Sequence, residues 1–169
     1  MIRPLSENDD PSGFSCGSRE LDSYLRRHAL PNSRAGVSAT HVFVDETGRI
    51  LGYVTLAATS VRATELPTYS PSLGLPGFPL PALLIARLAV DTSSRRRGLG
   101  TDLVGFAMAE ALVLHARVGC VGVMVDAKKS AVGFYARAGF TPTEQAEPEP
   151  RYTRMFMPIG TVADALRQT

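Results

Sequence analysis

The sequence predicts an α/β (α+β) protein in which helices flank a mixed β-sheet, and three observations lead to this class. Two extended patterns joined by a short polar turn predict an antiparallel hairpin. Two buried strand patterns are separated by a long amphipathic helix pattern, and such a right-handed crossover places its strands in parallel. A length of 169 residues fits one domain, 1–169, with a core of its own.

The composition is that of a soluble globular protein, with 44% apolar and 20% charged residues. No apolar run approaches the length of a membrane span, and the N-terminal segment lacks the features of a signal peptide. We therefore expect a cytoplasmic protein with no membrane partner. Cys16 and Cys120 lie far apart without metal-ligand spacing, which predicts free thiols and no metal site. A net charge of +2 does not by itself indicate a nucleic-acid binder, although the C-terminal half is the more basic.

The first predicted element is an amphipathic helix that begins after Ser18, a typical N-cap residue. Four residues at helical spacing form its predicted buried stripe: Leu21, Tyr24, Leu25 and His28. His28 on this stripe is interpreted as a core or boundary histidine. Pro31 is expected to end the helix.

Two strands and a long loop follow. The patterns His41–Val44 and Ile50–Ala58 surround the turn Asp45–Gly48 and predict the hairpin. Residues Thr64–Pro81 are so rich in proline and glycine that a loop is predicted for most of them. Its aromatic residues, Tyr69 and Phe78, either line the mouth of a substrate site or anchor the loop to the body.

The parallel pair comes next. Leu83–Asp91 is apolar on both faces, as expected for a central strand. The following helix, Leu99–Arg117, is predicted to bury one apolar side, made of Leu99, Leu103, Phe106, Ala107 and Leu114. Gly119–Asp126 is predicted as the second buried strand.

The last third of the chain predicts a helix at Ser130–Arg137, capped by Gly139, with Phe140 as the first core residue of another strand. An acidic turn at Glu144–Pro150 leads to a final strand, Tyr152–Ile159. The tail Val162–Arg167 is expected to add one or two helical turns.

The turn between the Leu83–Asp91 strand and the next helix has the features of an anion site. Backbone N–H groups at a helix N-terminus lack helical acceptors, and the helix dipole adds positive charge there. Gly98 and Gly100 allow a diphosphate to approach the backbone, and Arg95, Arg96 and Arg97 offer charged donors. On the turn alone, an ordinary strand–helix connection with a solvated basic turn is an equal alternative.

Two motifs remove this ambiguity. The spacing Arg95-x-x-Gly98-x-Gly100 resembles the acyl-CoA diphosphate loop of the GCN5-related N-acetyltransferases (GNAT), and Phe134-Tyr135-x-x-x-Gly139-Phe140 is similar to their second hallmark. The resemblance implies the GNAT fold, a mixed and mostly antiparallel sheet with a splayed parallel strand pair, and acetyl-CoA as the cofactor. It implies that the cofactor is bound by Ala89, Val90, Arg95, Arg96, Arg97, Gly98, Leu99, Gly100 and Thr101.

The same resemblance implies that Tyr135 is the catalytic residue, a general acid that protonates the departing CoA thiolate. General acid assistance of this kind contributes roughly two to four decades in rate. The alternative is a buried tyrosine whose hydroxyl bonds to a carbonyl group. No general base is assigned, and His41 and His115 are interpreted as structural. Lys128 stands where many relatives carry an asparagine that contacts the cofactor, and at this position the chain departs from the family pattern.

A narrower resemblance covers most of the chain. The segments Phe14–Leu25, Gly52–Ala57 and Pro81–Asp91 are similar to the acetyltransferase toxins of bacterial toxin–antitoxin pairs, which acetylate the α-amine of aminoacyl-tRNA and so block translation. This implies a tRNA substrate and a small ribbon-helix-helix antitoxin as partners, and a homodimer is common among such relatives. The residues proposed to contact tRNA are Arg87, Lys128, Lys129 and Arg137. The acidic residues of Glu144–Glu149 depart from the family pattern.

Two other functions fit the same motifs. One is acetylation of a small-molecule amine or a protein N-terminus, with the same cofactor chemistry. The other is a non-catalytic acyl-CoA binding module. The sequence does not identify the amino acid or tRNA that is recognised.

Overall fold

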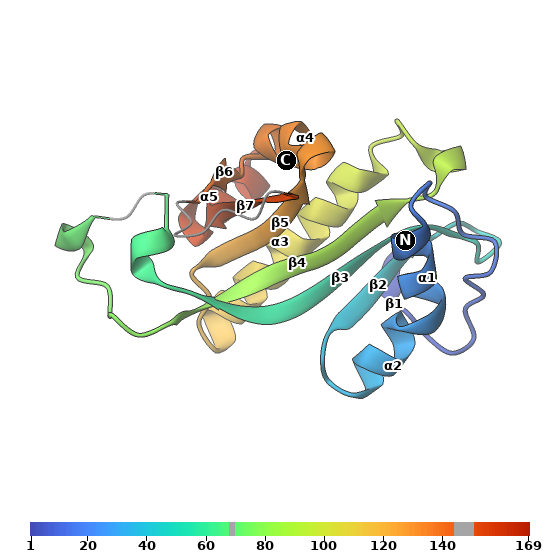
Figure 1. Cartoon of the computed structure of the whole chain (residues 1–169), viewed down its shortest axis with the longest axis horizontal. Coiled ribbons are helices and arrows are strands. Elements are labelled where there is room, and N and C mark those ends of the chain that lie inside the picture. The colour runs from blue at the N-terminus through green and yellow to red at the C-terminus, as the bar shows by residue number, and fades with distance from the viewer. Residues whose placement is uncertain (68–69, 144–150) are drawn as a thin grey trace. The chain divides into compact units, whose positions relative to one another are not determined.

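The computed structural model describes residues 1–67, 70–143 and 151–169, and its described strands form a seven-stranded sheet in the order β1-β2-β3-β4-β5-β7-β6 (Figure 1). The strands are β1 (Ile2–Pro4), β2 (Ala39–Val44), β3 (Ile50–Val61), β4 (Leu80–Val90), β5 (Gly122–Lys128), β6 (Thr141–Pro142) and β7 (Tyr152–Pro158). The helices are α1 (Arg19–Arg27), α2 (Ala29–Arg34), α3 (Leu99–Arg117), α4 (Val132–Ala138) and α5 (Ile159–Arg167). The sheet is mostly antiparallel with one parallel pair, which confirms the predicted fold class.

The chain divides into two compact units. The first contains Met1–Ala57 and Ile85–Ala107, and the second contains Ala58–Leu84 and Met108–Thr169. Strands β3 and β4 and helix α3 each contribute residues to both units. The prediction of a single domain therefore stays a prediction, and each unit is described by itself below.

In the first unit, α1 begins as predicted, because the Ser18 side chain accepts a hydrogen bond from the Leu21 N–H at 3.4 Å. Its end differs. The helix stops at His28, whose side chain is exposed and not part of the buried stripe. The prediction that Pro31 ends the helix is wrong, because Pro31 lies inside α2. It occupies the first turn of α2, where a backbone N–H has no helical acceptor and a proline costs little.

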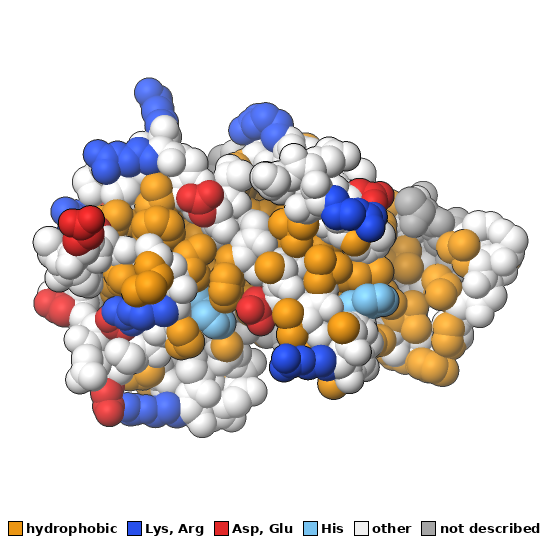
Figure 2. Space-filling view, turned by 180° about the vertical axis from the view of Figure 1, so that it is seen from behind, with side chains coloured by type: hydrophobic (Ala, Val, Ile, Leu, Met, Phe, Trp, Pro, Cys, Tyr) orange, Lys and Arg blue, Asp and Glu red, His pale blue; other side chains and the backbone are white. Residues whose placement is uncertain are grey.

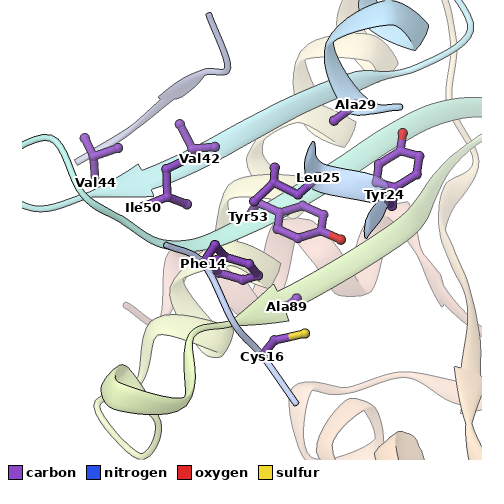
Figure 3. Packing of buried hydrophobic residues seen from close by; sticks show 10 residues of the cluster. All are labelled: Phe14, Cys16, Tyr24, Leu25, Ala29, Val42, Val44, Ile50, Tyr53 and Ala89. Carbon is purple, nitrogen blue, oxygen red and sulfur yellow. The ribbon is translucent and has the colours of Figure 1, made fainter. Parts of the chain in front are cut away.

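The predicted hairpin is confirmed. Strands β2 and β3 pair antiparallel, and Val44 pairs with Ile50 across the Asp45–Gly48 turn. Strand β1 extends the pairing on the other side of β2. A hydrophobic core lies on this part of the sheet and contains Phe14, Cys16, Tyr24, Leu25, Ala29, Val42, Val44, Ile50, Tyr53 and Ala89 (Figure 3). The core thus joins the N-terminal segment and α1 to the end of β4.

Strand β4 begins at Leu80 and not at the predicted Leu83, so the last residues of the predicted proline-rich loop belong to the strand. Helix α3 has the predicted bounds, Leu99–Arg117. Leu99, Leu103 and Ala107 are buried as expected, whereas Phe106 and Leu114 are only half-buried. Val104, Met108 and Ala111 are buried instead, so the buried face of α3 is rotated about the helix axis from the predicted face. By length and composition alone α3 could cross a membrane, but core helices of soluble proteins share this property.

In the second unit, β5 begins at Gly122 and not at Gly119, and it pairs antiparallel with β7. Helix α4 begins at Val132 after a 3-10 turn at Lys129–Ala131 and ends at Gly139, whose φ of 107° lies in the left-handed region. This confirms the predicted cap. Phe140 is buried, and β7 and α5 appear where strand and helix were predicted.

Several predicted features concern the loops and the surface. Tyr69 and the acidic turn at Glu144–Pro150 lie outside the described residues. Phe78 is 65% exposed, so its ring does not anchor the proline-rich loop. Cys16 and Cys120 are free thiols, as expected. On the face shown in Figure 2, hydrophobic side chains are exposed and Lys and Arg side chains lie in separate groups among them.

Candidate active site

The turn between β4 and α3 has an unusual backbone. Asp91 follows β4 directly and caps a 3-10 turn at Thr92–Ser94 by accepting a hydrogen bond from the Ser93 N–H. Arg96 has a φ of 63°, the only positive φ of a non-glycine residue in the described part of the chain, and Gly98 has a φ of 80°. A non-glycine residue held in this region is strained, and such residues gather at ligand sites.

The turn presents a continuous row of unpaired donors. No N–H group from Arg95 to Thr101 donates a hydrogen bond to any residue within 1–67, 70–143 or 151–169, and the next N–H, of Asp102, bonds to the Gly98 carbonyl. Apart from its neighbours in the chain, no described residue has an atom within 4 Å of the position a Cβ would take at Gly98. The row meets the positive end of the α3 dipole. This arrangement of free amides, open backbone and dipole fits the diphosphate of acetyl-CoA.

The three arginines of the turn differ in their contacts. Arg95 donates from Nη2 to the backbone carbonyl of Cys16 at 2.5 Å, so at least one of its donors is engaged within the protein. Arg96 and Arg97 are exposed and have no hydrogen-bond or ion-pair partner among the residues described. They are therefore the arginines with donors available to a phosphate group.

The end of β4 holds the other residues predicted to bind the cofactor. Ala89 is buried and Val90 is half-buried. A Cβ at Gly52 would lie 3.1 Å from the Ala89 carbonyl oxygen, so β3 approaches this strand closely and needs a residue without a side chain there. The role of Ala89 and Val90 in binding pantetheine stays a prediction. In the turn itself, Leu99 is buried and Gly100 half-buried, and Thr101 is exposed on the first turn of α3.

Tyr135 lies on α4 in the second unit. Its ring packs edge-on against Phe134 and Phe140, with centroid distances of 5.0 and 5.5 Å, and the residue is only 6% exposed. This burial raises the pKa of Tyr135 to about 12. Its hydroxyl bonds to no residue in the described ranges, and it is not among their fully buried, unpaired polar atoms. No described carbonyl accepts a hydrogen bond from this hydroxyl, and the role of Tyr135 as a general acid stays a prediction.

The cations proposed to contact tRNA have different surroundings. Arg87, in the first unit, lies over the Tyr24 ring with 3.8 Å between Cζ and the ring centroid. Lys128 and Arg137, in the second unit, are exposed, and Lys129 donates to the Thr153 hydroxyl at 3.0 Å. These three lie on one stretch of chain, the end of β5 and the following turn and helix, which also carries Tyr135.

Two of the histidines, His115 and His41, have a hydrogen-bond or packing contact within the protein. His115 lies with Nδ1 3.1 Å from the Cys120 carbonyl oxygen, and the His41 ring packs on Phe106 at 4.6 Å. Both contacts fit the structural roles expected of them. No group of three or more His, Cys, Asp or Glu side chains within 1–67, 70–143 and 151–169 could hold a metal ion.

One residue of the site has more contacts than the sequence suggested. Asp91, expected only as a strand end, is 2% exposed and accepts hydrogen bonds from the Ser15 N–H, from the Ser93 N–H and hydroxyl, and from Arg49. Burial alone would raise its pKa, but these donors outweigh burial and the pKa lies below its usual value. A carboxylate directly before a glycine-containing turn is a signal that sequence reading could have used.

Comparisons with known proteins agree with this geometry. A family model described as an acetyltransferase (GNAT) domain matches residues 38–142. A tRNA-acetylating toxin of Mycobacterium tuberculosis is 34% identical over 145 residues, covering 84% of this chain and 86% of the toxin. The structure of AtaT complexed with acetyl-methionyl-tRNAfMet superposes with a TM-score of 0.88 at 26% identity, covering 100% of this chain and 99% of that one.

A third similar structure is a tyrosine-to-phenylalanine mutant of the AtaT toxin, bound to the C-terminus of the antitoxin AtaR and to acetyl-CoA. It has a TM-score of 0.80 at 24% identity, covers 98% of this chain and 97% of that one, and so supports the fold alone. The match of a family model to more than half of the residues, together with the mycobacterial relative, shows that this chain belongs to the GNAT family of acetyltransferases.

Proposed function

We propose that this protein transfers the acetyl group of acetyl-CoA to the α-amine of an aminoacyl-tRNA and acts as a toxin that blocks translation. The observation that carries the cofactor half of this proposal is the row of unpaired N–H groups from Arg95 to Thr101 at the head of α3. The substrate half is supported by the 34% identical tRNA-acetylating toxin and by the likeness to AtaT in complex with an acetylated aminoacyl-tRNA.

In the transfer, the substrate amine attacks the acetyl carbonyl carbon, a C–N bond forms and the C–S bond breaks. When bound, acetyl-CoA supplies the activated thioester. The free amides of the turn hold the diphosphate, and Arg96 and Arg97 add charged donors. Tyr135 donates its hydroxyl proton to the leaving thiolate, and its raised pKa keeps the phenol protonated until that moment.

No general base is assigned, and the proposed substrate does not require one. The α-amine of an aminoacyl ester has a lowered pKa and is partly neutral near pH 7. The proton that the amine loses on acetylation then passes to solvent.

Cations near Tyr135 are proposed to bind the acceptor end of the tRNA. Lys128, Lys129 and Arg137 lie on the same stretch of chain as the tyrosine, and Arg87, in the first unit, is proposed separately as a tRNA contact. Neutralising backbone phosphates releases counterions, so this contribution is strongly dependent on salt. Because aminoacyl-tRNA is a substrate of the cytoplasm, we propose that the protein acts in the bacterial cytoplasm.

A toxin of this class needs a partner that restrains it. For this chain we propose a small ribbon-helix-helix antitoxin, the partner that the resemblance of the sequence to the acetyltransferase toxins implies. We also propose a homodimer, which size-exclusion chromatography with light scattering tests directly.

The decisive experiment incubates the protein with acetyl-CoA labelled in the acetyl group and with bulk aminoacyl-tRNA, and then identifies the labelled aminoacyl adducts by mass spectrometry. We expect label on the α-amine of one or a few amino acids, and expression in a bacterial host should arrest growth. Tyr135→Phe should abolish both effects. Tyr152→Phe, at a half-buried tyrosine of β7, is the matched control and should retain them.

Other outcomes identify the rival functions. Label on small amines or on protein N-termini, with none on tRNA, would make the protein an acetyltransferase of another substrate class. Saturable binding of acetyl-CoA without turnover against any amine would make it an acyl-CoA binding module. Growth arrest by Tyr135→Phe equal to that of the wild type would contradict the catalytic basis of toxicity.

A further inference from the structure

The N-terminal motif Phe14–Gly17 has no part in the function proposed so far, yet its backbone is almost fully bonded. The Phe14 carbonyl accepts from Arg26 at 3.2 Å, and the Cys16 N–H donates to the Asp22 carboxylate at 2.9 Å. These two bonds tie the segment to α1. The Phe14 ring packs edge-on against Tyr53 in the core, with 5.6 Å between centroids.

Three other backbone groups of the segment, on Ser15 and Cys16, bond to the β4–α3 turn. The Ser15 N–H donates to the Asp91 carboxylate at 3.0 Å, and the Ser15 carbonyl accepts from the Thr92 N–H at 2.9 Å. The Cys16 carbonyl accepts from Arg95 at 2.5 Å. The segment is therefore bonded both to α1 and to the turn, and Figure 3 shows Cys16 beside Ala89 at the end of β4.

Gly17 completes the contact. Its φ of 85° is in the left-handed region, and a Cβ there would lie 3.0 Å from Nη2 of Arg95, the same atom that bonds to the Cys16 carbonyl. A side chain at this position would therefore require the guanidinium to shift by a few tenths of an ångström, away from its contact with the Cys16 carbonyl. Glycine is favoured at position 17 because a Cβ there would crowd Arg95. An aspartate is favoured at position 22 because its carboxylate accepts the buried Cys16 N–H.

We propose that the segment Phe14–Gly17 is a strut that sets the conformation of the diphosphate-binding turn, with Asp91 and Arg95 as positioning residues that fix the turn to it. The proposal rests on the proposed function, because it assumes that this turn binds acetyl-CoA. Asp91 and Arg95 bond to the segment Phe14–Gly17 from either side of the 3-10 turn, and the row of free amides begins at Arg95. They hold those amides in place for the diphosphate, since preorganised donors lose little freedom on binding.

The strut makes a prediction opposite in sign to simple electrostatics. Asp91 is an anion next to a site for an anion, so Asp91→Asn considered by charge alone should strengthen binding of coenzyme A. An amide, however, has one accepting oxygen where the carboxylate uses both, Oδ2 for Ser15 and Oδ1 for Ser93. If the strut matters, Asp91→Asn should weaken binding of coenzyme A about tenfold.

The test is isothermal titration calorimetry of the purified full chain with coenzyme A. Gly17→Ala should also weaken binding about tenfold. Gly48→Ala is its matched control, because Gly48 has a φ of 84° and a Cβ there would have nothing within 4 Å. Both variants bear the same backbone strain, but only Gly17→Ala disturbs Arg95, and Gly48→Ala should bind as the wild type does.

The stoichiometry separates positioning from folding. A variant that merely unfolds part of the protein lowers the number of sites per chain and leaves the Kd of the rest unchanged. The strut instead predicts about one site per chain with a raised Kd. Wild-type affinity in Gly17→Ala, or tighter binding in Asp91→Asn, would overturn it. If Gly17→Ala does not fold, the sign of the change in Asp91→Asn decides alone. Absence of binding by the wild type would instead contradict the proposed cofactor.

Discussion

At the scale of single residues, the sequence motif around Tyr135 predicts the role of this residue, whereas its packing in three dimensions is known only from the structure. The motif before Gly139-Phe140 predicts that this tyrosine is a general acid, and the structure adds that its ring is buried and that its hydroxyl bonds to no described residue. Asp91 and Arg95 show the limit of such reading. Their hydrogen bonds to Ser15 and Cys16 join residues that are 76 and 79 positions apart in the sequence. No local pattern predicts a hydrogen bond between segments so far apart.

The first residue-scale prediction concerns Tyr135→Phe. Removing the proton donor should lower kcat by about a hundredfold or more, because general acid catalysis contributes roughly two to four decades. KM for acetyl-CoA should change little, since the ring still packs on Phe134 and Phe140. Steady-state kinetics with the identified aminoacyl-tRNA check both constants. A kcat within a factor of about two of the wild type would exclude the acid role.

The pH dependence of kcat gives a second prediction for the same residue. The neutral phenol is the active form, and it is present below its pKa. Because burial raises the pKa of Tyr135 to about 12, ionisation of this residue should not reduce kcat at any pH up to about 10. A pH–rate profile at saturating substrates measures this. A descending limb between about pH 8 and 10 that Tyr135→Phe eliminates would show that the phenol titrates earlier.

At the scale of elements, the periodicity of apolar residues predicts most helices and strands. One wrong prediction concerns a residue whose energetic cost in a helix depends on how close it lies to the helix end. Pro31 was expected to end a helix because proline lacks a donor, yet in the first turn of α2 no donor is needed. The bounds of α3 were predicted correctly, but its buried face was not, since burial depends on neighbours that the helix pattern does not contain.

Strand β5 contains a glycine with a packing reason, and this predicts a strong effect of substitution. A Cβ at Gly122 would lie 2.2 Å from the Met157 carbonyl oxygen and 2.5 Å from the Phe156 ring, both on β7. Gly122→Ala should therefore lower the free energy of unfolding by about 3 kcal/mol or more. Gly105→Ala in α3 is the control, because nothing lies within 4 Å of its Cβ and alanine favours helix by up to about 1 kcal/mol. Urea denaturation compares the two, and equal stabilities would contradict the close approach of β5 and β7.

Strand β1 is tied to the following segment by an ion pair that should make stability depend on pH. Arg3 donates two hydrogen bonds to the Asp9 carboxylate, and they lower the pKa of Asp9 to about 2. The folded-state pKa lies below the unfolded value, so the stabilisation is present above about pH 4 and is lost as pH falls toward about 2. At pH 7 Asp9→Asn should lower the free energy of unfolding by about 2 kcal/mol. Urea titrations at pH 7 and pH 3 should show this difference shrinking, and a difference independent of pH would refute the assignment.

At the scale of the whole molecule, the sequence predicted the family from two short motifs that lie in different units of the structure. Both motifs depend on local backbone geometry, namely glycines in the left-handed region and free amides at a helix N-terminus. Such motifs can therefore be recognised from the sequence. The surface that would bind tRNA is not legible in the same way. Exposed cations occur throughout the chain, and contacts with Asp126 or Thr153, which sequence does not show, already engage Arg154 and Lys129.

The dependence of activity on salt should separate cations that bind tRNA from those that are only exposed. Each phosphate contact that is lost should reduce the slope of log KM for tRNA against log salt concentration by about 0.7 to 0.9. We expect this reduction for Lys128→Gln and for Arg137→Gln, which change exposed cations close in sequence to Tyr135. Arg117→Gln, at an exposed cation at the end of α3, is the matched control and should keep the wild-type slope. Since KM for acetyl-CoA is measured in the same series, a change there without a change in slope would place Lys128 at the cofactor, whereas equal slopes in all three variants would exclude this stretch from the tRNA site.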